Sequence, residues 1–179
     1  MTFGLRGALL LSLIVAVGAP ARAQSDATIA SISKETRKAL DDTFDKWELA
    51  AIEPQTAACR SGGGEAPRLV RGDLNSDGQP DLALAIKARD GVHLVVVFER
   101  ATEHVVVDVE RLGDSAANGY LMIEPRGSAY VNPDDGLHDY FASDTLAVYR
   151  CGQPATAYFW SGLGFRKVSL VGDITAPSH

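Results

Sequence analysis

The sequence lacks the short motifs by which common enzyme chemistries are identified. It contains no G-x-S-x-G nucleophile elbow, no P-loop and no Rossmann glycine fingerprint. His93, His104 and His138 are scattered, and none belongs to an H-x-x-x-H pair or to a His/Cys group with zinc spacing. His93 stands in an apolar segment, where a hydrogen-bonded structural histidine is commoner than a ligand. No convincing catalytic constellation follows from these residues.

Long apolar runs are also missing. The stretch from Gly7 to Ala19 is too short for a membrane-spanning helix; it follows Arg6 and precedes Ala21-Arg22-Ala23. This arrangement is typical of a secretory signal peptide with an A-x-A cleavage site. We therefore expect residues 1–23 to be removed and residues 24–179 to form a single domain. The expected compartment is the periplasm or, alternatively, the extracellular space, with no membrane insertion after cleavage.

Basic residues are too few for a nucleic-acid-binding protein. Loss of residues 1–23 removes Arg6 and Arg22 but no acidic residue, which leaves 15 basic against 23 acidic residues and a net charge of −8. Contacts to phosphate require a basic surface, so nucleic acid is not an expected partner. An anionic membrane surface is equally unfavourable for so acidic a chain.

Cysteine is scarce: Cys59 and Cys151 are the only two, and they lie far apart in the sequence. In an exported protein such a pair is normally joined, because the compartment is oxidising. We therefore predict a disulfide between Cys59 and Cys151, with two free thiols as the alternative. The bond would tie the segment after the N-terminal helix to a C-terminal strand.

Oxygen-bearing side chains are concentrated in the segment from Asp73 to Asp81, whose sequence is D-L-N-S-D-G-Q-P-D. Asp73, Asn75 and Asp77 offer side-chain oxygens, Gln79 its backbone carbonyl and Asp81 a closing carboxylate. Ca²⁺ takes six to eight oxygen ligands, and a glycine after the third acid allows a sharp turn. Converging carboxylates repel one another, and a divalent cation relieves that repulsion. The segment predicts a calcium loop; the alternative is a polar hairpin that holds no metal.

This loop resembles the calcium loop of FG-GAP and related VCBS repeats, which lies between β-strands. The similarity covers roughly residues 70–87 and implies that the five residues named above are the ligands. It is not an EF-hand, because the twelfth position is Leu84 instead of Glu and an apolar strand pattern follows. Integrin propeller blades carry such loops, but this chain has a single copy and no blade-length repeat, so a propeller is not expected.

A second resemblance lies near the C-terminus. The segment from Tyr158 to Val168, followed by Gly172-Asp173, looks like the closing hairpin of small exported bacterial proteins of uncharacterised function. Those proteins also carry a GDLNGDGxPD-type loop followed by an apolar strand. The resemblance implies membership of an uncharacterised family and no particular activity.

The pattern along the mature chain predicts an α+β domain with a mainly antiparallel sheet. Ser33 is placed to cap an amphipathic helix from about Lys34 to Glu48, in which Leu40, Phe44 and Trp47 share one face. About seven or eight strands follow. The nearly unbroken apolar run 92–98 indicates a strand covered on both faces, one of them by the helix. Segments 155–160 and 165–171 predict a final hairpin.

Two classes of function remain open. The first is a calcium-stabilised, non-enzymatic exported domain that binds a protein or glycan partner or has a structural role in the envelope. The second is a small cell-wall or glycan hydrolase whose catalytic carboxylates are not identifiable from sequence. Glu99, Asp108 and Glu110 are candidates for a carboxylate pair, but their separation in space decides this. A cleft with two carboxylates, or with a His–carboxylate pair, would favour the second. The aromatic run 158–160 predicts either a binding platform or an ordinary alternation of core and surface side chains.

Overall fold

The computed structural model describes residues 31–51, 67–113, 119–132 and 135–170. Its first sheet has five antiparallel strands in the order β1-β3-β4-β5, and β2 pairs with the same edge of β3 as β1 does. β1 lies opposite the end of β3 and β2 opposite its beginning. The strands are β1 Glu48–Leu49, β2 Leu69–Gly72, β3 Asp81–Ala88, β4 Gly91–Glu99 and β5 His104–Arg111.

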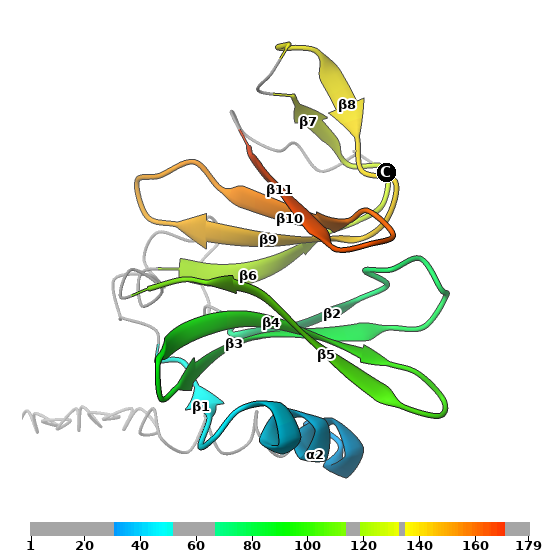
Figure 1. The fold of residues 1–179 in the computed structure, drawn as a ribbon. Helices are drawn as coiled ribbons and strands as arrows, with labels where there is room; N and C mark the ends of the chain where they lie inside the picture. Colours follow the sequence, from blue (N-terminus) through cyan, green and yellow to red (C-terminus); the bar gives the residue numbers. More distant parts are fainter. Residues whose placement is uncertain (1–30, 52–66, 114–118, 133–134, 171–179) are drawn as a thin grey trace, which may run out of the picture.

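The second sheet has four antiparallel strands in the order β11-β10-β9-β6, and a separate hairpin is formed by β7 and β8. The two sheets are stacked, with helix α2 (Lys34–Thr43) outside the first sheet and the β7–β8 hairpin beyond the second (Figure 1). The strands are β6 Gly119–Glu124, β7 Ala129–Val131, β8 His138–Tyr140, β9 Thr145–Arg150, β10 Thr156–Trp160 and β11 Phe165–Ser169.

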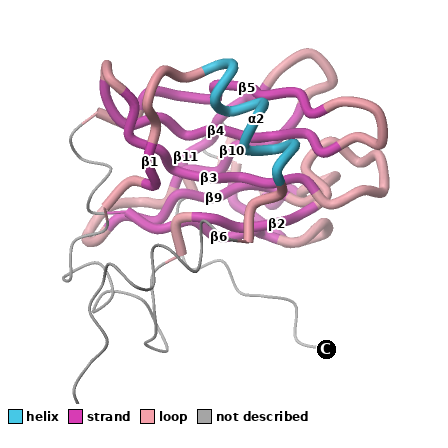
Figure 2. The backbone as a smooth tube through the Cα atoms, turned by 90° about the horizontal axis from the view of Figure 1, so that it is seen from below, coloured by secondary structure: helices cyan, strands magenta, loops and turns pink. Residues whose placement is uncertain are grey.

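The first sheet is buried on both faces, as the apolar run 92–98 predicts. Along β4, Leu94, Val96 and Phe98 pack toward the second sheet, whereas Val95 and Val97 pack under the helix. Successive side chains of a strand point to opposite faces, so only a continuously apolar strand satisfies two cores. Figure 2 shows α2 lying across the strands of this sheet. Leu40 of the helix belongs to the same buried cluster as Val95 and Val97, in agreement with a helix that covers one face.

Helix α2 begins directly after Ser33, whose Oγ accepts a hydrogen bond from the Thr36 backbone N–H at 3.0 Å. An N-cap of this kind satisfies one of the amide groups that the first turn leaves without a partner. Leu40 is fully buried against the sheet, and Phe44 and Trp47 are partly buried in the same cluster. The apolar spacing therefore identified the buried side chains correctly.

The end of the helix differs from the expectation. The helix stops at Thr43, not near Glu48, and Phe44 is already extended. Lys46 has a left-handed backbone (φ 53°), which does not continue a right-handed helix, and residues 48–49 then pair with β3. Residues 48–49 can either extend the helix or form hydrogen bonds with the edge of β3, and in the structure they pair with β3. Helix periodicity cannot detect this competition, because β3 lies more than 30 residues along the chain.

The described residues form eleven strands, so the expectation of about seven or eight was too low. The additional ones are short: β1 has two residues, and β7 and β8 have three each. Strands this short carry too little alternation to be identified from sequence. The final hairpin is confirmed, with Thr156–Trp160 pairing against Phe165–Ser169. The described residues form two stacked antiparallel sheets and a small hairpin, which agrees with the expectation that the fold is not a propeller.

Several sequence-based expectations fall outside the described residues. The signal peptide (residues 1–23) and Cys59 lie there, so both the cleavage and the Cys59–Cys151 disulfide stay predictions. Cys151 itself directly follows β9 and is partly buried. In the described part of the chain, none of the helices has the length and apolar character needed to cross a bilayer.

Glu99, at the end of β4, joins the helix to the first sheet. Its carboxylate accepts hydrogen bonds from the Thr36 hydroxyl of α2 and from the Arg71 guanidinium of β2. The side chain is 17% exposed, so these bonds lie in a partly desolvated position. Burial alone would raise the pKa of Glu99, but the bonds from Arg71 and Thr36 outweigh burial and hold it below its ordinary value.

We expect Glu99→Gln to lower the free energy of unfolding by about 1–3 kcal/mol near neutral pH, because two bonds to a charged acceptor are weakened. The folded-state pKa of Glu99 is depressed, so its stabilisation is present above 4.5 and is lost as the pH falls through the folded-state value. The difference between wild type and variant should therefore shrink in acid. Urea unfolding across this range measures it. Glu103→Gln, at an exposed ion pair with Arg100, is the control and should change little.

Candidate metal centre

The segment Asp73–Asp81 forms the loop of a β-hairpin. It begins after Gly72, the last residue of β2, and ends at Asp81, the first residue of β3; these two residues are paired across the hairpin. The expectation that the loop joins two neighbouring strands is confirmed. Strand β3 follows the loop directly where an EF-hand would have a helix, in agreement with the exclusion of an EF-hand.

Hydrogen bonds from backbone N–H groups to side-chain oxygens of the same loop hold its conformation. Asn75 Oδ1 accepts from the Asp77 N–H at 2.8 Å, Asp77 Oδ1 accepts from the Gln79 N–H at 2.8 Å, and Asp73 Oδ2 accepts from the Gly78 N–H at 3.1 Å. Gly78 has a positive φ of 83°, as expected of the glycine. Ser76 also has a left-handed backbone (φ 61°), which the sequence did not indicate.

The first and ninth positions each hold a buried carboxylate oxygen that has no hydrogen-bond partner. Asp81 is 1% exposed; its Oδ2 accepts from the Leu74 N–H at 3.0 Å, while its Oδ1 has none. Asp73 Oδ1 is likewise buried and unpartnered. Buried polar atoms are nearly always satisfied in folded proteins, so each exception calls for an explanation. A cation bound between these oxygens would supply the missing partner.

The electrostatics of Asp81 agree with this geometry. Burial raises its pKa to about 6, and the neighbouring carboxylates of Asp77 and Asp73 act in the same direction, against the lowering effect of the backbone amides. The charged form of Asp81 is therefore disfavoured in the absence of a cation. A divalent ion reverses the sign of the local field and favours the carboxylate.

The middle positions of the loop, Asn75 and Asp77, are hydrogen-bonded to each other. Asn75 Nδ2 donates to Asp77 Oδ2 at 2.9 Å, so both oxygens of Asp77 accept hydrogen bonds within the loop. Asp77 and Gln79 are exposed. Among the residues that the structure describes, no group of three or more His, Cys, Asp or Glu side chains is arranged to hold a metal ion. Calcium binding by these donors would require the Asn75–Asp77 bond to be exchanged for metal contacts; Asp77 is exposed and Asn75 is partly buried.

Sequence reasoning missed Asp144, which lies just before β9. Its Oδ2 accepts from the Asp73 N–H and its Oδ1 from the Arg126 N–H, both at 3.0 Å. Asp144 is separated from the loop by some 70 residues and belongs to no motif, so only the tertiary structure brings it there. It connects the first residue of the loop to the second sheet.

His93 forms a His–carboxylate group with Asp90 and Asp108, and its imidazole is buried and hydrogen-bonded at both nitrogens. His93 Nδ1 lies 2.9 Å from Asp108 Oδ2 and His93 Nε2 lies 3.0 Å from Asp90 Oδ1. The ring is 6% exposed and packs on Phe44 at 5.4 Å. With both nitrogens occupied and the ring buried, His93 has no free atom for a substrate. This supports the prediction of a satisfied structural histidine.

The three carboxylates considered for hydrolysis have separate partners. Glu99 binds Thr36 and Arg71, as described above, and Asp108 binds His93. Glu110 accepts from the Tyr158 hydroxyl at 2.7 Å and from Lys167 Nζ at 2.9 Å, which links β5 to the second sheet. Each carboxylate bonds a different set of side chains, and no two of them share a hydrogen-bonding partner.

The aromatic run 158–160 alternates between core and surface. Tyr158 is 3% exposed, and Trp160 packs edge-on against Phe98 at 5.1 Å. Phe159 lies on the other face, with the Arg166 guanidinium 6.0 Å from its ring centre. The run therefore stabilises the stacked sheets and does not form a continuous aromatic platform.

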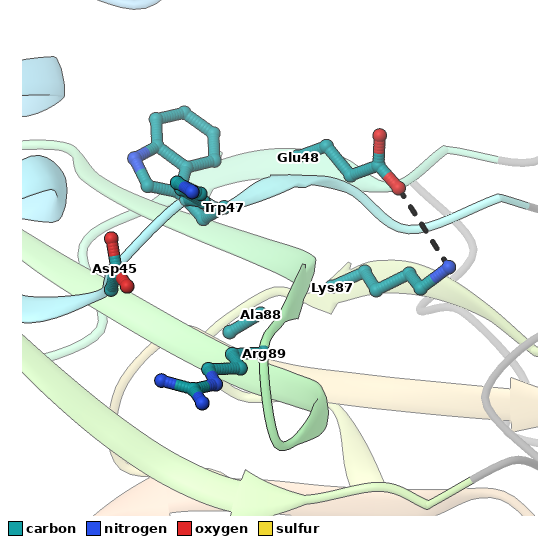
Figure 3. A pocket seen from close by; sticks show the side chains of 7 residues that line it. Asp45, Trp47, Glu48, Lys87, Ala88 and Arg89 are labelled. Carbon is teal, nitrogen blue, oxygen red and sulfur yellow. Dashed lines mark ion pairs between the residues drawn. The ribbon is translucent and has the colours of Figure 1, made fainter.

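A cavity of about 700 Å³ opens at the other end of β3 from the loop, between the α2–β1 connection and the β3–β4 turn. Trp47 forms one side, and Glu48 and Lys87 form an ion pair at 3.9 Å (Figure 3). Most of the other side chains are charged and exposed. The full lining is Asp45, Lys46, Trp47, Glu48, Lys87, Ala88 and Arg89.

Comparison with known proteins adds no assignment: no protein-family model, no curated protein and no solved structure matches the chain. The resemblance of residues 70–87 to FG-GAP and VCBS loops therefore stays a prediction from the motif.

Proposed function

We propose that this chain is an exported, non-enzymatic domain stabilised by calcium at residues 73–81. It would serve in the periplasm, or outside the cell, by binding a protein or glycan partner or by a structural role in the envelope. The observation that carries the proposal is the pair of buried carboxylate oxygens, on Asp73 and Asp81, that lack a partner. Two such atoms in one short loop are unfavourable, and a bound cation would offset that cost.

Each residue of the loop has a role in this proposal. Asp73 and Asp81 would hold the ion from the buried side, Asn75 and Asp77 would close over it, and Gln79 would contribute its backbone carbonyl. Calcium supplies positive charge that offsets the repulsion between the carboxylates. The Asp77 and Asp73 carboxylates already raise the pKa of Asp81, after burial as the main cause, so they lie near enough for this repulsion to matter.

The position of the loop supports stabilisation and not catalysis. A catalytic metal keeps an open position and commonly takes ligands from separated elements, whereas one contiguous loop offers about five here. The loop also closes the β2–β3 pair. Leu74, within the loop, is fully buried in the core between the two sheets. Fixing the loop therefore fixes the register of two strands.

The proposal of a protein or glycan partner rests on the acidic composition and on the cavity beside Trp47. An aromatic side chain with charged neighbours suits a protein or glycan surface. The net charge of the mature chain makes nucleic acid an unsuitable partner.

Isothermal titration of chelated protein tests the metal assignment. We expect Ca²⁺ to bind with one-to-one stoichiometry and more tightly than Mg²⁺, because Mg²⁺ demands a compact octahedron and retains its water. Asp77→Ala should abolish binding, whereas Gln79→Ala should not, since that residue contributes a backbone atom. Absence of Ca²⁺ binding by the wild-type protein would refute the proposal.

The alternative is a small cell-wall or glycan hydrolase, and one observation favours it: two carboxylates, Asp45 and Glu48, line the same cavity. However, the Glu48 side chain is 68% exposed and is paired with Lys87. A general acid for glycoside cleavage needs a desolvated carboxyl group, which this exposure does not provide. Turnover of glycan substrate by wild type that is lost in both Asp45→Asn and Glu48→Gln would establish the alternative.

A further inference from the structure

The Asp144 carboxylate bridges two backbone segments that are distant in sequence. One oxygen accepts from Asp73, the first residue of the loop, and the other from Arg126, in the turn between β6 and β7. Hydrogen bonds from amides to a carboxylate are stronger than neutral ones. The two segments therefore share a single anchor, which itself lies just before β9.

Gly72, which precedes the loop, is closely packed against β6 and Asp144. A Cβ atom on Gly72 would lie 3.0 Å from Ile123 Cγ2 and 3.1 Å from Asp144 Oδ2. The end of β2 thus lies directly against β6 and Asp144, and a side chain at position 72 would require these neighbours to shift by a few tenths of an ångström. Asp73 follows Gly72 directly, so this contact holds the start of the loop beside Asp144, which accepts the Asp73 N–H.

On its other side, Asp144 lies at the root of the β7–β8 hairpin. The turn before β7 is closed by a bond from the Ser128 N–H to the Pro125 carbonyl at 3.0 Å. Gly127 donates to the Phe141 carbonyl at 2.8 Å, and the Phe141 N–H donates to the Ser128 carbonyl at 3.1 Å. The root is thus a short ladder held at one end by the Arg126–Asp144 bond.

We propose that Asp144 is a positioning residue that couples calcium occupancy of the 73–81 loop to the order of the β7–β8 hairpin root. The inference rests on the proposed function, because it requires the loop to bind calcium. Asp73, held as a ligand, presents its N–H to Asp144 in one position. Asp144 then holds the Arg126 N–H, and the ladder through Gly127 and Phe141 opens less often.

The coupling gives the loop an effect on a distant surface. The hairpin carries Leu137 and Tyr140, which are 65% and 64% exposed and are two of the three large apolar side chains most open to solvent in the described residues. By linkage, whatever orders the hairpin root must also tighten calcium binding by the same factor. A coupling equal to one hydrogen bond corresponds to about fivefold in each direction.

A proline substitution removes the bridging bond, because proline lacks the N–H and its Cδ takes the space through which Asp144 Oδ1 accepts it. Arg126 is the second residue of the 125–128 turn, and Gly127, the third, has a positive φ of 84° while Arg126 does not. A positive φ at the third position alone agrees with a type II turn, in which proline is favoured at the second position. Arg126→Pro therefore preserves the turn and deletes the N–H that Asp144 accepts. Arg126→Ala is the matched control, since it keeps that N–H.

The experiment measures amide hydrogen exchange of Gly127 and Phe141 in chelator and in saturating Ca²⁺, with saturation verified by calorimetry. In wild type and in Arg126→Ala we expect calcium to slow exchange at both amides by about fivefold. In Arg126→Pro this increment should disappear. Asp144→Asn, which keeps the size but replaces one acceptor by a donor, is the second variant, and the increment should disappear there too.

A purely structural role for Asp144 predicts faster exchange in Asp144→Asn by the same factor with and without calcium, and that result would overturn the proposal. An unchanged calcium increment in Arg126→Pro would also overturn it. If wild type binds calcium but shows no increment at Gly127 and Phe141, the coupling is wrong and the proposed function stands. If calorimetry detects no calcium binding, both are wrong.

Discussion

Calcium added to chelated wild-type protein should raise its melting temperature by roughly 5–10 °C, and magnesium should raise it less. An ion that binds only the folded state at a hundredfold excess over its dissociation constant adds about 2.7 kcal/mol to the free energy of unfolding. For a domain of this size each kcal/mol corresponds to about 2–4 °C. The physical source is the relief of the unpartnered oxygens of Asp73 and Asp81. Scanning calorimetry measures the shift.

The variant Asp81→Asn separates the cost of the buried charge from the gain on binding. Asn can still accept the Leu74 N–H, while the buried and partnerless Oδ1 is replaced by an uncharged group. We therefore expect the chelated variant to melt at or above chelated wild type, yet to show no response to calcium. Gln79→Ala is the control that should respond like wild type. A melting curve of wild type that does not move with calcium would contradict the prediction.

The largest loss of stability is expected for Leu84→Ala, at about 2–5 kcal/mol. Leu84 is fully buried in β3, where it packs in the cluster under the helix with Leu40 and Val95. Truncation removes apolar contacts and leaves a cavity that strands paired on both edges cannot collapse to fill. Equilibrium urea unfolding measures the change, with the slope against denaturant checked for two-state behaviour.

The matched control is Leu163→Ala, because Leu163 is 98% exposed in the β10–β11 turn. Its effect should stay within about 0.5 kcal/mol. A loss below about 1 kcal/mol for Leu84→Ala would mean that the helix does not cover this face of the sheet as a packed layer. The experiment therefore tests the three-layer arrangement itself, in which the first sheet lies between the helix and the second sheet.

Local features of the fold could be predicted because each one is encoded within a few residues. Ser33 at the helix start, the glycine turn at Gly78 and the final hairpin all depend on backbone preferences of neighbouring positions. The apolar run 92–98 indicated burial on both faces because its side chains have no polar alternation. The oxygen pattern of residues 73–81 likewise placed the candidate site in a loop between strands.

The features that could not be predicted depend on partners far away in the chain. The helix ends at Thr43 because residues 48–49 find an open edge of β3, and β7 and β8 are too short to show a period. The setting of His93 between Asp90 and Asp108 requires the β4–β5 register, which includes a bulge at Leu94/Val95. Register between strands is set by the whole sheet and not by either strand alone.

The candidate metal site divides in the same way. The sequence alone determined which atoms the loop can offer, because alternating oxygen donors and one glycine are properties of consecutive residues. The tertiary structure alone decided that the oxygens of Asp73 and Asp81 are buried without partners, and that Asp144 holds the loop to the second sheet. Burial and long-range hydrogen bonds arise only when the two sheets stack, since stacking removes water from residues that the unfolded chain leaves solvated.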